Sequence, residues 1–295
     1  MTFAVIGLSV FLYLSSMKTT LLFLSVFLSA NLFGQNVYIP DANFKSYLIG
    51  NSVINTNGDT EIQVSEASAF SGAIFCASLN ISDLTGIEAF TSLTELNCQG
   101  NQIESLDLSN STALETIYCG LNQLTSLDLS SNTSLTFLDC FGNQLTSLDV
   151  SNNTSLGLMG CGSNQLASLD VSNNTVLAAL VCENNQLECL NFKNGNNTLL
   201  VTFLASGNPN LTCIQVDDVN YSTTNWTSID PQTYYGEDCD DDCDDPTLGI
   251  NELTTTKSLI QILDMMGRET SFKPNTPLIY VYDDGSIEKV FSVEY

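Results

Sequence analysis

The side chains of this 295-residue chain that could do chemistry are carboxylates, amides and thiols. The sequence contains no His, which removes the commonest general base, the usual zinc ligand and every nucleophile that depends on a neighbouring imidazole. It contains 33 Asp and Glu but only 7 Lys and Arg, for a formal charge of −26. Catalysis could therefore come only from carboxylates or from a bound metal.

The basic residues are also unevenly placed, with none between Lys45 and Lys193. Nucleic-acid binding depends on basic side chains that neutralise phosphates, so we expect no nucleic-acid partner. Binding to an anionic membrane surface is excluded for the same reason. The chain is nevertheless 43% hydrophobic and only 14% charged, so it can bury a core for one to two domains.

One group of amides and carboxylates has the spacing of a twelve-residue calcium loop. Positions 1, 3, 5, 7 and 12 would be Asn55, Asn57, Asp59, Glu61 and Glu66. The pattern resembles the loops of EF-hand and dockerin proteins, and a helix started by Pro40 and Asp41 should precede it. Position 1 is Asn rather than Asp, and position 6 is Thr60 rather than Gly. The sequence thus favours a metal-free structural turn, with a weak Ca²⁺ site at these residues as the alternative, and no cofactor is required.

The thiols fall into two groups. Five lie 21 residues apart and should point into the core, because free Cys behaves as a small buried hydrophobe; they are Cys98, Cys119, Cys140, Cys161 and Cys182. Two others, Cys189 and Cys213, occupy equivalent outward positions and could form a disulfide between neighbouring strands. The alternative pairing joins Cys213 to Cys239.

The regular cysteines mark an internal repeat of 21 residues from Leu93 to Phe192. Each unit reads LxxLxCxxNxLxxLDLSxNxx, and an Asn stands three residues after each Cys; these are Asn101, Asn122, Asn143, Asn164 and Asn185. The pattern resembles the leucine-rich repeat family in its short bacterial variety. The resemblance implies a solenoid of stacked coils.

The alternation within each unit makes the same prediction in physical terms. The last two apolar positions of LxxLxC are two residues apart, so they point to one side of a short strand. Such a strand buries that side only by stacking against its neighbours, and a second LxxLxL run in each unit repeats the pattern. We therefore expect a mainly β leucine-rich repeat solenoid with two short parallel sheets, little helix and a ladder of buried Asn.

The solenoid should occupy residues 71–216, between two atypical ends that cover its open edges. Residues 35–70 form the predicted helical N-terminal cap, which holds the calcium-like loop. Residues 217–236 form the C-terminal cap and contain the only Trp, Trp226. Each cap is expected to bury the last coil beside it.

The outward positions of the two runs differ in variability. The second run repeats Ser and Asp, which suits a solvated face, although a cation-binding stripe is an alternative; its acids are Asp107, Asp128, Asp149 and Asp170. The first run varies and carries aromatic and aliphatic residues typical of protein recognition. The predicted partner-binding residues are Tyr118, Leu121, Phe137, Asp139, Phe141 and Leu158. The alternative is drift on an unused face.

The two ends of the chain carry features of export. Residues 1–34 are almost continuously apolar and predict a signal peptide whose true start is Met17, with a membrane anchor as the alternative. Residues 237–252 predict an acidic linker. Residues 253–295 alternate like short strands, and their DxxGRE and YxxxxDG segments resemble the sorting tail of type IX secretion cargo, although its proline-containing opening motif is missing. A small structural β module is the alternative.

Together these features predict a secreted or outer cell-surface protein that binds a protein or a glycan and catalyses nothing. One alternative is a purely structural stalk. The other is a carboxylate-based hydrolase, which would need two acids converging in a cleft.

Overall fold

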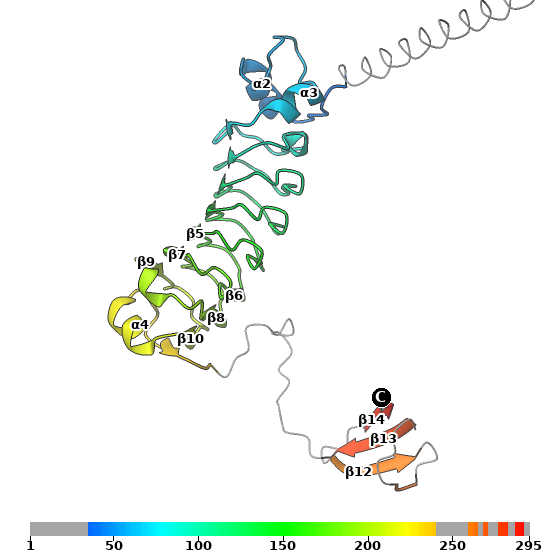
Figure 1. The fold of residues 1–295 in the computed structure, drawn as a ribbon, viewed down its shortest axis with the longest axis vertical. Coiled ribbons are helices and arrows are strands. Elements are labelled where there is room, and N and C mark those ends of the chain that lie inside the picture. Colours follow the sequence, from blue (N-terminus) through cyan, green and yellow to red (C-terminus); the bar gives the residue numbers. More distant parts are fainter. Residues whose placement is uncertain (1–34, 240–258, 265–267, 271–276, 283–286, 292–295) are drawn as a thin grey trace, which may run out of the picture. The chain divides into compact units, whose positions relative to one another are not determined.

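The computed structural model describes residues 35–239, 259–264, 268–270, 277–282 and 287–291 (Figure 1). The chain divides into two compact units, Met1–Pro246 and Thr247–Tyr295. The predicted signal peptide lies outside the described residues, as does most of the predicted acidic linker.

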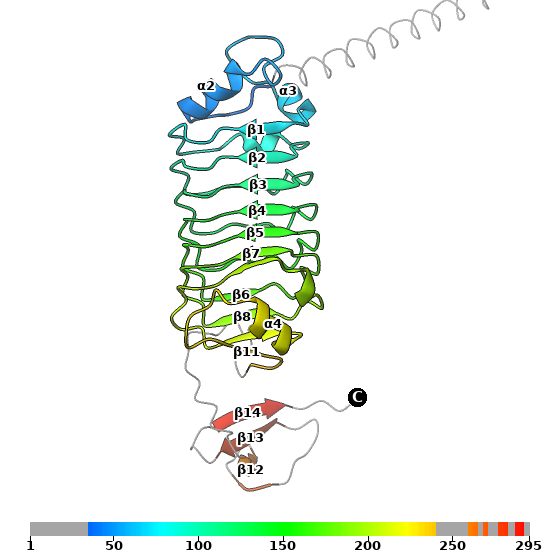
Figure 2. The same ribbon diagram turned by 90° about the vertical axis from the view of Figure 1, so that its left-hand side faces the viewer.

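Seven short parallel strands form the first sheet, one from each coil (Figure 2). In spatial order they are β1 (Ala73–Phe75), β2 (Glu95–Asn97), β3 (Thr116–Tyr118), β4 (Phe137–Asp139), β5 (Leu158–Gly160), β7 (Ala179–Val181) and β9 (Thr202–Leu204). The central residue of every strand is buried, and the residue on each side of it is at least partly exposed. The predicted alternation of inward and outward side chains is confirmed.

The second sheet is shorter than the repeat suggested. It contains β6 (Ser168–Asp170), β8 (Cys189–Phe192), β10 (Cys213–Val216) and β11 (Tyr234–Gly236), in the order β11-β10-β8-β6. The three earlier copies of this run, which end near Asp107, Asp128 and Asp149, have no strand assigned. Pairing begins at β6, where the backbone N–H of Val171 also donates to the carbonyl of Asn191 at 3.0 Å. Two parallel sheets are therefore present, but the second spans only the C-terminal coils.

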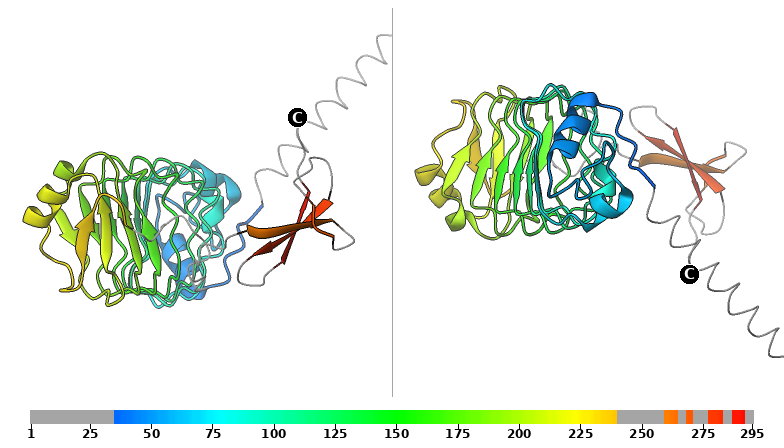
Figure 3. Two further views of the ribbon diagram at one scale, coloured as in Figure 1. Left: turned by 90° about the horizontal axis from the view of Figure 1, so that it is seen from below. Right: turned by 90° about the horizontal axis from the view of Figure 1, so that it is seen from above.

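Short helical elements close the two ends of the stack (Figure 3). At the N-terminal end, α2 (Ala42–Gly50) begins at Asp41, whose carboxylate accepts the backbone N–H groups of Asn43 and Phe44, both at 2.9 Å. Phe44 and Leu48 lie one helical turn apart and are both buried. The short α3 (Val64–Ala69) follows, and a 3-10 turn, η1 (Ile87–Ala89), precedes β2.

The C-terminal end is covered by η2 (Asn197–Leu199), α4 (Val219–Asn225) and β11. Trp226 follows α4 and is only 3% exposed. Its ring centroid lies 4.9 Å from that of Phe203 and 5.2 Å from that of Phe192. This aromatic cluster buries the end of the core, in the role predicted for the C-terminal cap.

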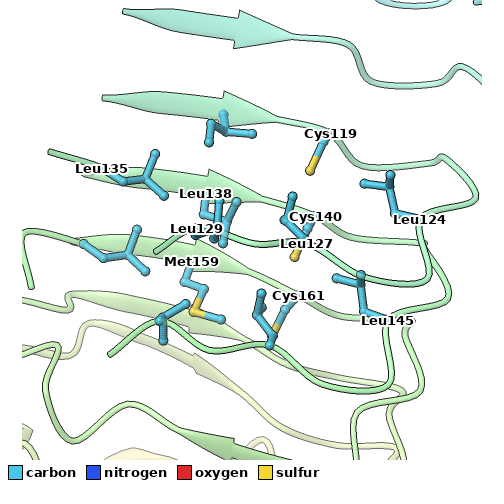
Figure 4. Close-up of a cluster of buried hydrophobic side chains, with 14 of the residues drawn as sticks. Cys119, Leu124, Leu127, Leu129, Leu135, Leu138, Cys140, Leu145, Met159 and Cys161 are labelled. Carbon is cyan, nitrogen blue, oxygen red and sulfur yellow. The ribbon is translucent and has the colours of Figure 1, made fainter. Parts of the chain in front are cut away.

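One continuous core runs from the N-terminal cap to the C-terminal cap. Figure 4 shows Cys119, Cys140 and Cys161 above one another in successive coils, beside inward-pointing Leu138 and Met159. Six cysteines of this column are free thiols with no exposed surface; they are Cys76, Cys98, Cys119, Cys140, Cys161 and Cys182. The core position predicted for the five regularly spaced cysteines is confirmed, and Cys76 joins them.

The buried Asn residues tie each coil to the one before it. The side-chain NH₂ of Asn143 donates to the carbonyls of Cys140 at 3.0 Å and Cys119 at 3.1 Å. Its Oδ1 accepts the backbone N–H of Leu124 at 3.0 Å. Corresponding bonds recur at Asn101, Asn122, Asn164, Asn185 and Asn208. The predicted Asn ladder is confirmed.

The second compact unit contains an antiparallel sheet of three strands. They are β12 (Leu259–Asp264), β13 (Pro277–Tyr282) and β14 (Ile287–Phe291). The β character predicted for the tail is confirmed, and its proposed sorting role remains a prediction. Within the described ranges, no helix is long and apolar enough to cross a membrane.

Candidate functional site

The register of the first sheet aligns its outward side chains in two columns. Phe137 lies beside Thr116 and Leu158, and in the second column Asp139 lies between Tyr118 and Gly160. The six predicted partner-binding residues therefore come from neighbouring coils. We call them the binding patch: Tyr118, Leu121, Phe137, Asp139, Phe141 and Leu158.

The aromatic part of the patch is packed rather than fully exposed. The ring centroids of Tyr118 and Phe137 are 4.6 Å apart, with the planes tilted by 39°. Each residue is half-buried, and the contact crosses from one coil to the next. Such a pair offers a pre-ordered apolar surface, because little side-chain freedom is left to lose on binding.

The aliphatic part is open to solvent. Leu121, Leu158 and Phe141 are 51%, 43% and 39% exposed. The Leu121 side chain reaches the next coil, where its Cδ2 atom lies 2.9 Å from the place a Cβ on Gly142 would take. Contiguous exposed apolar side chains of this kind mark interaction surfaces more often than isolated ones do.

The backbone conformation at Leu121 is unusual for a bulky residue. Its φ is +54°, in the left-handed region that bulky residues rarely adopt. The same position of other coils also has a positive φ but carries a better-suited residue, such as Gly100, Gly142, Asn184 or Gly207. Leu121 is thus a bulky residue at a strained backbone position, with about half of its side chain in water.

The second face has a uniform, locally satisfied surface. A carboxylate oxygen of Asp107 accepts the backbone N–H of Ser109 at 3.0 Å, and Asp128 and Asp149 do the same for Ser130 and Ser151 at 2.9 Å. Hydrogen bonds from the side chain and backbone of Ser109 lower the pKa of Asp107. This arrangement matches the solvated-face prediction, since the carboxylates serve their own turns.

The calcium-like loop directs its polar groups to its own backbone. Both oxygens of Glu66 are used: one accepts the backbone N–H of Thr56 at 2.8 Å, and the other accepts that of Gln63 at 3.0 Å in the capping box of α3. Burial raises the pKa of Glu66, but hydrogen bonds from Gln63, Thr56 and Asn57 outweigh it and lower the pKa.

The other predicted ligands of the loop are engaged in the same way. Asn55 Oδ1 accepts the backbone N–H of Gly58 at 3.0 Å, and Asn57 and Asp59 are hydrogen-bonded to each other. Glu61 pairs with Lys45 at 2.7 Å. Across the described ranges, no group of three or more His, Cys, Asp or Glu is arranged to hold a metal ion. The geometry is that of the structural turn, and calcium binding stays a prediction.

The disulfide geometry decides between the two predicted pairings of Cys213. Cys213 is bonded to Cys239, with the two Cα atoms 5.9 Å apart. Cys189 is itself disulfide-bonded, so it is not paired with Cys213. The bond links β10 to the residues that follow β11 and fixes the C-terminal cap.

A surface cavity of about 460 Å³ lies in the N-terminal cap, lined by Val53, Thr56, Ser65, Glu66, Ala69, Phe70, Ser71 and Gly72. It holds a single carboxylate, which is already engaged in the capping box. A hydrolase of the predicted alternative type needs two acids on opposite sides of its substrate. This cavity does not provide that pair.

The geometry defines a leucine-rich repeat solenoid, built from 21-residue coils, a continuous parallel sheet and a buried Asn ladder. No protein-family model matches the chain, and no curated protein matches it.

Two similar solved structures come from Listeria monocytogenes. The functional domain of InlJ, described as including a cysteine ladder, is 26% identical with a TM-score of 0.40; the match covers 62% of this chain and about half, 52%, of that one. The internalin InlF is 20% identical with a TM-score of 0.48, covering 67% of this chain and 68% of that one. Because both TM-scores lie below 0.5, the fold assignment rests on this chain's own coils.

One residue of the site escaped the sequence reasoning. Gly160 lies directly beside Asp139 in the second outward column. It is the only Gly in that column, whose other members are Phe75, Asn97, Tyr118, Asp139, Val181 and Leu204. The signal in the sequence is a Gly at an outward strand position where the equivalent residues of other coils carry side chains.

Proposed function

We propose that the chain is a secreted or cell-surface recognition protein that binds another protein through the binding patch and carries out no catalysis. The observation that carries this proposal is the cluster of exposed Leu121, Phe141 and Leu158 around the packed pair of Tyr118 and Phe137. Aromatic and aliphatic anchors of this kind supply most of the energy at protein interfaces. A glycan is the less favoured partner, because two exposed Leu side chains offer it no hydrogen bonds.

The location outside the cell rests on two features. The Cys213–Cys239 disulfide fits an oxidising compartment, and the apolar N-terminal residues have the pattern of a signal peptide. The proposed sorting role of the tail fits the same route of export.

The test is a binding assay of the protein against host, matrix and self surface fractions. We expect the combined variant Tyr118→Ser, Phe137→Ser and Phe141→Ser to bind at least about tenfold more weakly, because it removes three anchors. The matched control changes Ser105, Ser126 and Ser147 of the second face to Ala and should bind normally. At the positions of Tyr118 and Phe137 in the first sheet, other coils carry Asn, Thr and Ala, so the Ser replacements should fit the strands. Equal binding by both variants would favour the structural stalk instead.

A further inference from the structure

Gly160 leaves one coil of the second outward column without a side chain. A Cβ built on Gly160 would meet only the Asp139 carboxylate, with Oδ1 at 3.4 Å and Cγ at 3.9 Å, and the carbonyl oxygen of Leu138 at 4.0 Å. These are ordinary contact distances, so the backbone does not require Gly here. The position is therefore open to a side chain from outside the chain.

A carboxylate stands at this open position. Asp139 Oδ1 accepts the backbone N–H of Phe141 at 3.0 Å, and this is the one hydrogen bond to the carboxylate in the described part of the chain. Oδ1 also lies 3.4 Å from the place a Cβ on Gly120 would take, so two residues next to the acid, Gly120 and Gly160, carry no side chain. The second oxygen, Oδ2, is left available for a donor.

Aromatic residues neighbour the same carboxylate in sequence and in register. Phe137 and Phe141 lie two residues before and after Asp139 along the chain, and Tyr118 is its register partner on β3. Aromatic faces attract cations, and Arg in particular can stack on a ring while its fork of donors meets a carboxylate. A cationic side chain is the one type that is attracted both by the aromatic faces and by the carboxylate of Asp139.

The surrounding charge points the same way. Between Lys45 and Lys193 the sequence holds fifteen Asp and Glu and no Lys or Arg. No Lys or Arg between residues 45 and 193 can thus neutralise Asp139, and the field of this part of the solenoid attracts positive charge and repels anions.

We propose that the patch takes an Arg or Lys side chain of its protein partner at the open position over Gly160, where the cation meets the free oxygen of Asp139 and the adjoining aromatic rings. This inference rests on the proposed function and names the chemistry of the partner. The apolar residues of the patch then hold the segment on either side of that cation.

The probe is a random-peptide phage library panned on the full chain. Enriched peptides should carry Arg or Lys next to apolar residues, and replacing that residue by Gln in a synthetic copy should weaken binding about tenfold or more. Asp139→Asn should have the same effect. Gly160→Val should also weaken binding about tenfold, because it fills the open position with the residue that the next coil carries as Val181.

The matched control is Asp149→Asn, which removes one charge from the second face but keeps an oxygen for the backbone N–H of Ser151. It should leave peptide binding unchanged, and melting temperatures should show that all variants are folded. Peptides that lack basic residues, or that bind Asp139→Asn as well as the original chain, would overturn the inference. If such peptides still depend on Tyr118 and Phe137, the proposed function stands. If no peptide depends on the patch, both fail.

Discussion

The two outward faces of the same coils carry opposite kinds of side chain. On the second face each coil repeats Ser and Asp, and each Asp serves the turn that follows it. On the first face the outward positions change from coil to coil, and apolar residues gather at β3, β4 and β5. The turns of the second face require the repeated Asp, whereas no such requirement fixes the outward residues of the first face. We therefore propose the first face as the one that contacts a partner.

The two faces also differ beneath the surface. The ladder after the first-face strands is fully bonded, as at Asn143. Asn132, Asn153 and Asn174 are buried after the runs of the second face and form a second ladder. The side-chain NH₂ of Asn153 donates to the carbonyls of Leu129 at 3.2 Å and Asn132 at 2.8 Å, but its buried Oδ1 has no partner. The side-chain oxygens of Asn132 and Asn174 are also buried without a hydrogen-bond partner. The first face thus lies over the Asn ladder whose side-chain hydrogen bonds are complete.

The largest expected effect concerns the thiols under the first face. Burial raises the pKa of Cys76 and Cys182 to about 12, and it also raises the pKa values of the four cysteines between them well above their usual range. Only the thiolate reacts, so iodoacetamide at pH 8 should label none of the six in the folded chain and all six in denaturant without reductant. Mass spectrometry counts the labels. Rapid labelling of any of these six cysteines in the folded chain would show that the core is accessible to solvent there.

A smaller effect should separate the two ladders. Asn143→Ala leaves the buried backbone N–H of Leu124 without its acceptor and removes one of the two side-chain donors to the carbonyls of Cys119 and Cys140. We expect a cost of roughly 1 to 3 kcal/mol, mainly for the unsatisfied N–H group. Asn153→Ala should cost less, because it also removes an oxygen that is already unpaired. Asn152→Ala, at an exposed position, should stay within about 0.5 kcal/mol. The denaturant midpoint of unfolding is measured for all three variants. Equal midpoint shifts for Asn143→Ala and Asn153→Ala would contradict the difference in hydrogen bonding between the two ladders.

The smallest effect has the opposite sign. Leu121→Gly relieves a side chain held at positive φ and should raise the stability by up to about 1 kcal/mol. The same change removes an exposed anchor and should weaken partner binding. A control is Ser163→Gly, which relieves the same backbone position two coils further along, outside the patch, and should leave binding unaffected. A loss of stability in Leu121→Gly would show that the side chain serves folding instead.

The sequence allowed most of the fold to be predicted, because each coil contacts only its neighbours and the 21-residue period fixes the register. Asn143, the column of cysteines and the patch around Phe137 follow from that register alone. The limited second sheet did not, since its pairing depends on how far apart successive coils lie. The role of Glu66 was also open: the same spacing suits a calcium ligand and a capping box, and only the path of the loop decides which groups reach it. Cys189 illustrates the same limit, because a disulfide partner is set by proximity in space.

The central claim is that the first face of the solenoid contacts the partner. The most direct measurement places the photoreactive residue p-benzoylphenylalanine at Leu158 in one full-length variant and at Ser147 of the second face in another, both at exposed positions. Each variant is irradiated in the presence of the same surface fraction, and crosslinked products are compared by electrophoresis. The account predicts a discrete crosslinked species from position 158 and none from position 147. Crosslinking from position 147 alone would contradict it.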